Sequence, residues 1–236
     1  MTSISLIIPA YNEAKRLPLA LNSLADFFAG AQLNLQEVII VDDGSSDETV
    51  AVASSFSEHL PIKVLRLDAN YGKGYAVKRG VEAAVGELII MYDADGATLP
   101  TSLTPLIEAS ADCPIVIGSR VLSKQVQISF WRRLVGFIFH LLCFPLIPGI
   151  KDASCGAKVF RYGVAQAIFK ETRLKRFAFD IEVLWLARQK GYEIKELPVA
   201  WQERPGSKVK VGRDAPEMFL AILGLYFRAL LVKIKL

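Results

Sequence analysis

The chain has 236 residues, 52% of them hydrophobic and 22% charged, and a formal net charge of +4. A chain of this size and composition can build a sizeable core, which excludes intrinsic disorder. Cys113, Cys143 and Cys155 lack metal or redox spacing, which indicates a reducing compartment. His59 and His140 are too few and too far apart for a histidine metal site. We therefore expect chemistry based on carboxylates, a metal, arginine and lysine.

Charge is divided unevenly along the chain. Residues 1–119 hold 7 Lys+Arg and 15 Asp+Glu, whereas residues 120–236 hold 21 and 9. This division predicts an acidic, cation-binding half and a basic half that faces phosphate, nucleic acid or an anionic membrane, although an uneven and uninvolved surface would give the same counts. The opening MTSISLIIPAYNE lacks the regions of a signal peptide, so we expect the protein not to be exported.

Short β-rich runs alternate with helical patterns in the first half. Strands are expected at 3–9, 37–43, 62–67, 87–93 and 114–119, and helices near 13–29, 47–58 and 73–85. This order predicts an α/β fold with a mostly parallel, Rossmann-like sheet flanked by helices. Such sheets present ligand-binding residues at the carboxyl ends of their strands. Polar or special residues follow the strands that end at Pro9, Asp43, Asp93 and Ser119.

Two apolar segments mark the second half. One runs from Leu134 to Ile147, behind Arg132 and Arg133, and the other lies in the C-terminal EMFLAILGLYFRALLVKIKL. Each has about 15 apolar-rich residues, fewer than the roughly 20 that a spanning helix needs. They predict helices that lie in a membrane interface, with buried core helices or an oligomer contact as the alternatives. We expect a single domain, 1–236, with a nucleotide-sugar and metal half (1–119) and an acceptor and membrane-facing half (120–236).

Asp93 and Asp95 stand directly behind the apolar run 88–92. At positions i and i+2 of an extended segment, both side chains point to the same side. Burying these carboxylates without partners would cost several kcal/mol. Oxygen ligands of this kind suit Mg²⁺ or Mn²⁺, which take their remaining ligands from substrate phosphates and water. The pair therefore predicts a divalent-metal site, although D-x-D alone is a weak signal.

Several motifs occur together in one order along the chain. IIPAYNE, IIVDDGSSDET, NYGKG and IIMYDADGAT resemble the inverting, family-two glycosyltransferases, which have a GT-A type nucleotide-sugar-binding fold. VIGSR, GIKDASCGAKVFR and RFAFDIEVLWLARQKGYEIKELPVAWQERPGSKV are similar to the polyprenyl-phosphate branch, most of all to the enzymes that glucosylate dolichyl phosphate. The resemblance implies transfer of glucose, with inversion, from UDP-glucose to a polyprenyl phosphate. It also implies a protein peripheral to, or embedded in, the cytoplasmic face of a membrane.

The resemblance also implies roles for particular residues. Nucleotide-sugar contacts are expected at Pro9, Tyr11, Glu13, Asp42, Asp43, Lys73, Asp93 and Lys208. Among these, Asp42 or Asp43 would bond the uracil and Asp93 would meet ribose or metal, while Asp95 would ligate the metal. Lys73 would reach the phosphates, or be a solvated lysine beside a helix cap. Lys208, next to Gly206, resembles a flexible loop that closes on the phosphates.

The acceptor site is expected to depend on arginines. Arg120 follows a strand and is placed to meet the diphosphate or the acceptor phosphate, and Arg132 and Arg133 could hold a lipid phosphate or merely snorkel at a helix end. A phosphate monoester has a second pKa of about 6, so its oxygen is already ionised and can attack without a general base. Asp152 and Asp180 are candidates for positioning, for base catalysis if the acceptor were a hydroxyl, or for structural ion pairs.

Other functions stay open at this point. They are transfer of mannose from GDP-mannose or of another sugar, transfer to a sugar hydroxyl, and a membrane-associated protein that binds nucleotide sugars without turnover. Nucleic-acid binding is not expected, because the basic residues do not interleave with a recognisable motif. The sequence leaves open a homo-oligomer, the identity of the sugar and the length of the lipid.

Overall fold

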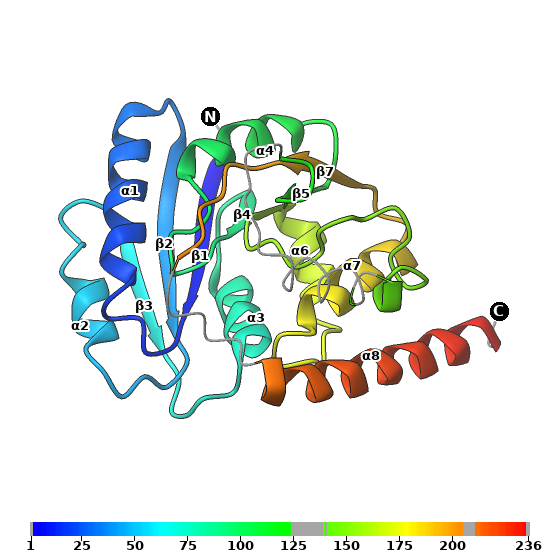
Figure 1. The fold of residues 1–236 in the computed structure, drawn as a ribbon. Helices are drawn as coiled ribbons and strands as arrows, with labels where there is room; N and C mark the ends of the chain where they lie inside the picture. Colours follow the sequence, from blue (N-terminus) through cyan, green and yellow to red (C-terminus); the bar gives the residue numbers. More distant parts are fainter. Residues whose placement is uncertain (1, 124–138, 140, 205–210, 235–236) are drawn as a thin grey trace.

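The computed structural model describes residues 2–123, 139, 141–204 and 211–234, and it is built around a seven-stranded sheet (Figure 1). The strand order is β3-β2-β1-β4-β6-β5-β7. The strands are β1 Ser3–Ala10, β2 Asn34–Asp42, β3 Ile62–Arg66, β4 Leu88–Met91, β5 Ile115–Ser119, β6 Lys158–Arg161 and β7 Ile194–Pro198. All pairs are parallel except those of β6 with β4 and β5. The predicted mostly parallel α/β sheet is confirmed.

Helices cover both faces of this sheet. The helices are α1 Leu17–Gly30, α2 Thr49–Ser54, α3 Lys73–Ala83, α4 Leu103–Ala109, α6 Tyr162–Phe169, α7 Phe179–Gln189 and α8 Val211–Ile234, and a 3₁₀ turn, η1 (Pro100–Ser102), precedes α4. Apolar residues of α1, α2 and α4 pack on one face, and those of α3, α6, α7 and α8 on the other. Two cores therefore hold the sheet between them, and the strand ends form the rim on which loops meet.

The predicted elements differ from the observed ones mainly at their ends. The first helix begins at Leu17 instead of residue 13, and a turn precedes it in which the backbone N–H groups of Arg16 and Leu17 both donate to the Glu13 carbonyl. The helix expected at 47–58 is only Thr49–Ser54, and beyond it the hydroxyl groups of Ser55 and Ser57 donate to nearby carbonyls instead.

Strand β6 was not predicted, and it inserts between two strands of the first half. It runs antiparallel to both neighbours, with Lys158 opposite Met91 of β4 and Ile117 of β5. An antiparallel strand begins at the rim where its parallel neighbours end. The segment that leads into β6 is thereby brought to the same rim as the polar residues that follow β4.

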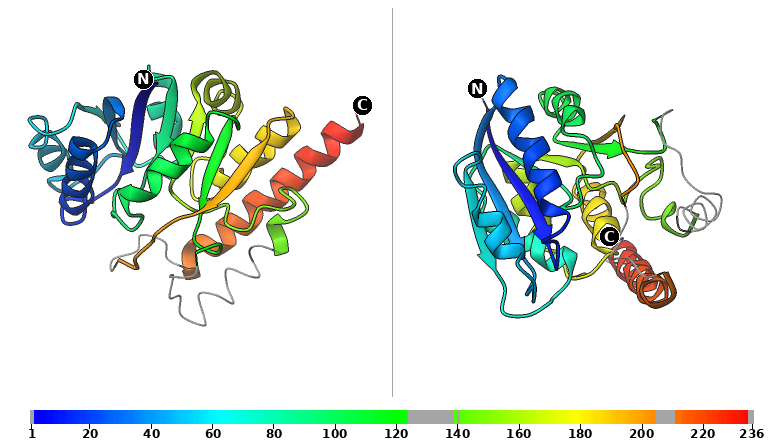
Figure 2. Two further views of the ribbon diagram at one scale, coloured as in Figure 1. Left: turned by 90° about the horizontal axis from the view of Figure 1, so that it is seen from above. Right: turned by 60° about the vertical axis from the view of Figure 1, so that its left-hand side comes forward.

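Helix α8 lies along the outer side of the layer that contains α7 (Figure 2). Ile222 and Leu225 are buried in the core, and the Tyr226 hydroxyl donates to the Leu142 carbonyl at 2.6 Å. Its outward side exposes large apolar side chains, namely Phe219, Leu220, Leu223, Phe227, Leu230 and Leu231. No helix in the described part of the chain is long and apolar enough to cross a membrane.

The apolar segment predicted at 134–147 is described only in part, because residues 134–138 and 140 lie outside the described residues. In the remainder, Cys143, Leu146 and Ile147 pack in the core, whereas Leu141 and Phe144 are exposed. This part therefore matches the core-packing alternative as well as the interfacial one.

Candidate active site

The loops that follow β1 and β2 are joined by side-chain hydrogen bonds. Asn12 has a positive φ of 52°, a conformation that asparagine tolerates better than most residues. Its N–H donates to the Ser45 hydroxyl, and its own side-chain oxygen accepts from the Ser46 N–H, both at 2.8 Å. The Glu13 N–H donates to the Thr49 hydroxyl at 2.8 Å. Sequence reasoning missed Asn12, which fastens these two loops into one surface.

Asp42 and Asp43, at the end of β2, are both buried. The Asp42 carboxylate accepts the Ser45 N–H at 3.2 Å and lies 3.7 Å from Nε of Arg66. The Asp43 carboxylate accepts the N–H groups of Tyr71 and Gly72, each at 2.8 Å. Burial raises the pKa of Asp43, and these two hydrogen bonds oppose the rise. Asp43 thus fixes the NYGKG loop at the start of α3, where Gly72 has φ +105°.

Asp93 and Asp95 lie in a turn rather than in an extension of β4. The strand ends at Met91, and the chain turns over residues 93–96, with φ +63° at Gly96. The extended geometry predicted for this pair is therefore wrong, because the backbone turns at Ala94 and Asp95 and the Gly96 N–H donates back to the Asp93 carbonyl. The two carboxylates still interact, since burial and the nearby Asp93 charge both raise the pKa of Asp95.

Lys73 reaches across from α3 to Asp93. Its Nζ lies 2.6 Å from Oδ1 of that carboxylate. Burial acts to raise the pKa of Asp93, but Lys73 outweighs it and holds this pKa below its ordinary value. Burial likewise acts against the Lys73 ammonium, and Asp93, with Asp180 and Asp95, raises its pKa nonetheless. Both groups are therefore charged at neutral pH.

Arg16 lies on the other side of the turn. Its Nε donates to Glu13 at 2.7 Å, and its Nη1 lies 3.8 Å from Oδ2 of Asp95. Among the described residues, two buried side-chain nitrogens make no hydrogen bond, namely Nη1 of Arg16 and Nε of Arg204. Arg204 lies near Tyr92, and its charge opposes the rise that burial causes in the pKa of Tyr92. A buried guanidinium donor without an acceptor is costly, so this region suits a bound anion.

A divalent cation fits the residues present at the turn. Both carboxylates are partly exposed, and Oδ1 of Asp95 accepts the Ala97 N–H at 3.0 Å. Mg²⁺ and Mn²⁺ bind one or two carboxylates and complete their shells with phosphate and water. Within the described ranges, no three or more His, Cys, Asp and Glu side chains are grouped so as to hold an ion by themselves. Asp93 and Asp95 are the residues that would hold such a metal, and Arg16 lies beside them.

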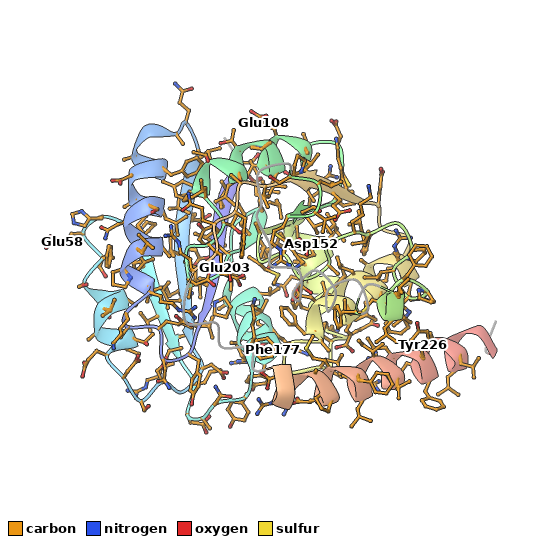
Figure 3. The ribbon with its side chains drawn as sticks, in the orientation of Figure 1. Glu58, Glu108, Asp152, Phe177, Glu203 and Tyr226 are labelled. Atoms are coloured by element: carbon orange, nitrogen blue, oxygen red, sulfur yellow. The ribbon has the colours of Figure 1, made fainter. Side chains whose placement is uncertain are left out.

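Arg120 and Asp152 form a bidentate ion pair (Asp152 is labelled in Figure 3). The Nε and Nη2 atoms of Arg120 lie 2.8 and 2.7 Å from the two carboxylate oxygens, and its backbone N–H donates to Oδ2 at 2.8 Å. The Asp152 N–H in turn donates to Glu196 at 2.7 Å. Burial acts to raise the pKa of Asp152, but Arg120 outweighs it and lowers this pKa. Asp152 is therefore ionised and held by its partner.

Asp180, the other candidate base, is also in an ion pair. Its Oδ1 lies 2.6 Å from Nζ of Lys158, a side chain with no exposed surface, and that ammonium also donates to the Cys155 carbonyl. Sequence reasoning missed Lys158. The available signal was a lysine at the head of the apolar run KVF, which must find a partner if that run is buried.

The remaining predicted residues are only partly described. Pro9 is in β1 at the rim, and Tyr11 follows it with 39% of its surface exposed. Arg132, Arg133, Gly206 and Lys208 lie outside the described residues. The site therefore brings together Glu13, Asp42, Asp43, Lys73, Asp93, Asp95, Arg120, Asp152 and Asp180 around the ends of the strands.

Comparison with known proteins gives both sequence and structural likeness. The model of a family described as glycosyl transferase family 2 matches residues 5–169. The chain is 39% identical to the dolichyl-phosphate beta-glucosyltransferase of Dictyostelium discoideum, covering 97% of this chain and 75% of that protein. It is 36% identical to the dolichyl-phosphate beta-glucosyltransferase of Homo sapiens, covering 87% and 69%.

Two solved structures share the fold. Mannosyl-3-phosphoglycerate synthase from Rubrobacter xylanophilus gives a TM-score of 0.73 at 20% identity, covering 100% of this chain and 76% of that one. Glucosyl-3-phosphoglycerate synthase from Mycobacterium tuberculosis, crystallised with Mn²⁺, UDP-glucose and phosphoglyceric acid, gives 0.67 at 16% identity, covering 94% and 77%. The fold of this chain is therefore of the GT-A type.

Proposed function

The chain belongs to glycosyl transferase family 2, and from this premise we propose that it is a hexosyltransferase that moves glucose, with inversion, from UDP-glucose to a polyprenyl phosphate of the dolichyl type. The names of its relatives support both the sugar and the lipid. The observation that carries the proposal in the molecule is the Asp93–Asp95 turn, which Lys73 and Arg16 flank with positive charge.

The donor binds at the rim formed by the ends of β1, β2 and β4. Asp93 and Asp95 would hold Mg²⁺ or Mn²⁺ there, and such an ion would neutralise the charge of the departing UDP. Lys73 and Arg16 add cationic groups on either side of the turn, and Nη1 of Arg16, which makes no hydrogen bond within the described residues, would supply a donor for a phosphate oxygen. The residues from 1 to 119 thus form the donor half of the enzyme.

The state of Asp152 and Asp180 favours a phosphate acceptor over a hydroxyl. Both acids are engaged by cations, at 2.7 Å by Arg120 and at 2.6 Å by Lys158. Asp152 held in this way is a poor general base, because its ion pair stabilises the deprotonated form. An ionised phosphate monoester needs no base, so alignment of its oxygen with the anomeric carbon suffices.

The acceptor half, residues 120–236, faces the lipid. The exposed apolar side chains of α8 lie in the interface on the cytoplasmic face of a membrane, as in other interfacial helices. By the resemblance alone, Arg132 and Arg133 would bind the acceptor phosphate and Lys208 would close over the donor phosphates; all three lie outside the described residues. This arrangement lets the lipid headgroup reach the site without leaving the membrane surface.

The test is transfer by the purified chain in detergent. Radiolabelled UDP-glucose, a polyprenyl phosphate and Mg²⁺ or Mn²⁺ should give a product that is extracted into organic solvent. Asp95→Ala should abolish it, whereas Asp112→Ala should not, because Asp112 is exposed and precedes β5 at the opposite rim.

Each rival function has its own outcome in this assay. A preference for GDP-mannose as donor would indicate that the transferred sugar is mannose. A labelled product that stays in water would indicate a hydroxyl acceptor. Binding of UDP-glucose without UDP release would indicate a protein without turnover. No product with any nucleotide sugar, from folded protein supplied with metal, would refute the proposed function.

A further inference from the structure

Gly156 packs directly against the carboxylate of Asp93. A Cβ added at Gly156 would lie 2.0 Å from Oδ2 and 2.7 Å from Oδ1 of that side chain. Nonbonded atoms do not approach so closely, so any larger residue must displace the carboxylate or the backbone. Gly156 is not among the glycines with positive φ. Space, rather than backbone conformation, is what requires glycine at this position.

The backbone around Gly156 is itself fixed on both sides. The buried Lys158 ammonium donates to the Cys155 carbonyl and pairs with Asp180. The Gly118 N–H of β5 donates to the Ala157 carbonyl at 2.8 Å. Lys158 also lies opposite Met91, the last residue of the strand that leads to Asp93. Segment 155–158 is therefore a rigid wall whose position relative to Asp93 is set by β6.

Asp93 is confined between this wall and a cation. Lys73 Nζ lies 2.6 Å from Oδ1, and the Gly156 backbone closes the other side against Oδ2. The Lys158 charge is a further influence that lowers the pKa of Asp93. A carboxylate held from two sides needs no ordering when a metal and a nucleotide arrive, which saves the entropy of fixing it.

We propose that Gly156 is a positioning residue that sets the carboxylate of Asp93 for the metal and the UDP diphosphate, with Lys158 fixing the segment that carries it. This inference rests on the proposed function, because it assigns Asp93 to donor binding. It adds a role for the segment that precedes β6. In this segment Gly156 acts through the space it leaves for Asp93, since it has no side chain that could touch the donor.

The experiment measures UDP binding in MnCl₂ by isothermal titration calorimetry, so it does not depend on turnover. Gly156→Ala should raise the Kd for UDP in Mn²⁺ by about tenfold or more, since displacement of a site group by about 1 Å has large effects. Gly163→Ala is the matched control. A Cβ added at Gly163, in α6, meets no atom within 4 Å, so its Kd should match the wild type.

A double-mutant cycle separates positioning from a general structural effect. In an Asp93→Ala background the clashing carboxylate is gone, so Gly156→Ala should change Kd by less than about twofold there. If Gly156→Ala does not fold, the double variant should regain the unfolding temperature of Asp93→Ala, because the clash is removed. Failure of the double variant to regain it would overturn the inference.

The two proposals fail in different ways. Wild-type protein that binds no UDP in Mn²⁺ would refute donor binding itself and with it the proposed function. Wild-type binding that Gly156→Ala leaves within about twofold, or an equal loss in the Asp93→Ala background, would overturn the positioning role alone.

Discussion

Lys158→Met removes one partner of the ion pair beneath the site. The Lys158 side chain has no exposed surface, and that of Asp180 is only 8% exposed. The substitution leaves the Asp180 carboxylate and the Cys155 carbonyl without their donor, while methionine keeps most of the side-chain volume. Breaking a buried pair in this way costs about 3–5 kcal/mol. In a chain of this size, that cost lowers the unfolding temperature by about 6–20 °C.

The measurement is urea unfolding followed by circular dichroism, with calorimetry for the unfolding temperature. Lys158→Met with Asp180→Asn should recover much of the loss, because no buried charge is left unpaired. Lys190→Met is the matched control, since its pair with Glu171 is partly exposed and is worth about 1 kcal/mol or less. The reasoning would be refuted if Lys158→Met lost no more stability than this control.

Three further outcomes are expected. Asp95→Asn keeps the side-chain volume but removes a carboxylate charge, so Mn²⁺ titration followed by electron paramagnetic resonance should show about tenfold weaker binding; an unchanged Kd would remove Asp95 from the metal site. Phe227→Glu, where the native ring is 69% exposed, should keep the unfolding temperature and lower co-sedimentation with anionic vesicles; undiminished binding would contradict the role of α8. Burial acts to raise the pKa of Asp152, but Arg120 outweighs it and lowers this pKa in the folded protein. The ion pair therefore contributes its full stabilisation of the fold above the unfolded pKa of about 4, and this contribution is lost as pH falls through the lower folded pKa. The stabilities of wild type and Asp152→Asn should converge below about pH 4, and a constant difference would contradict this ion pair.

The strands that could be predicted from the sequence are those in which an apolar run is followed by polar residues. β1, β2 and β4 have this form, and they lead to most of the residues of the proposed donor site. β6 has the sequence Lys-Val-Phe-Arg, four residues with a charged residue at each end. Its burial depends on Asp180, which pairs with Lys158 from 22 residues away. Periodicity cannot reveal such a strand, because the pairing that buries its lysine is tertiary.

The same limit applied to the site. The spacing of Asp93 and Asp95 predicted an extended pair at the end of a strand, but the two residues lie in a turn over residues 93–96. Asp152 and Asp180 could be read as bases or as ion-pair partners until their cations were located, Arg120 being 32 residues from Asp152. Gly156 carried no chemical signal at all, since its importance is the space it leaves for another side chain.

The place of β6 has a consequence for the order in which the protein can be made. β4 and β5 follow one another along the chain, yet in the sheet they do not pair directly. Each pairs with β6, which lies between them and ends at Arg161. After Ser119 has left the ribosome, synthesis of the intervening residues takes about 2–8 s at typical rates. Throughout that time the edges of β4 and β5 have no partner between them, and exposed edges favour pairing with other chains. A nascent chain of this protein therefore passes through a stage in which residues 1–119, the proposed donor half, are synthesised but the sheet is still open.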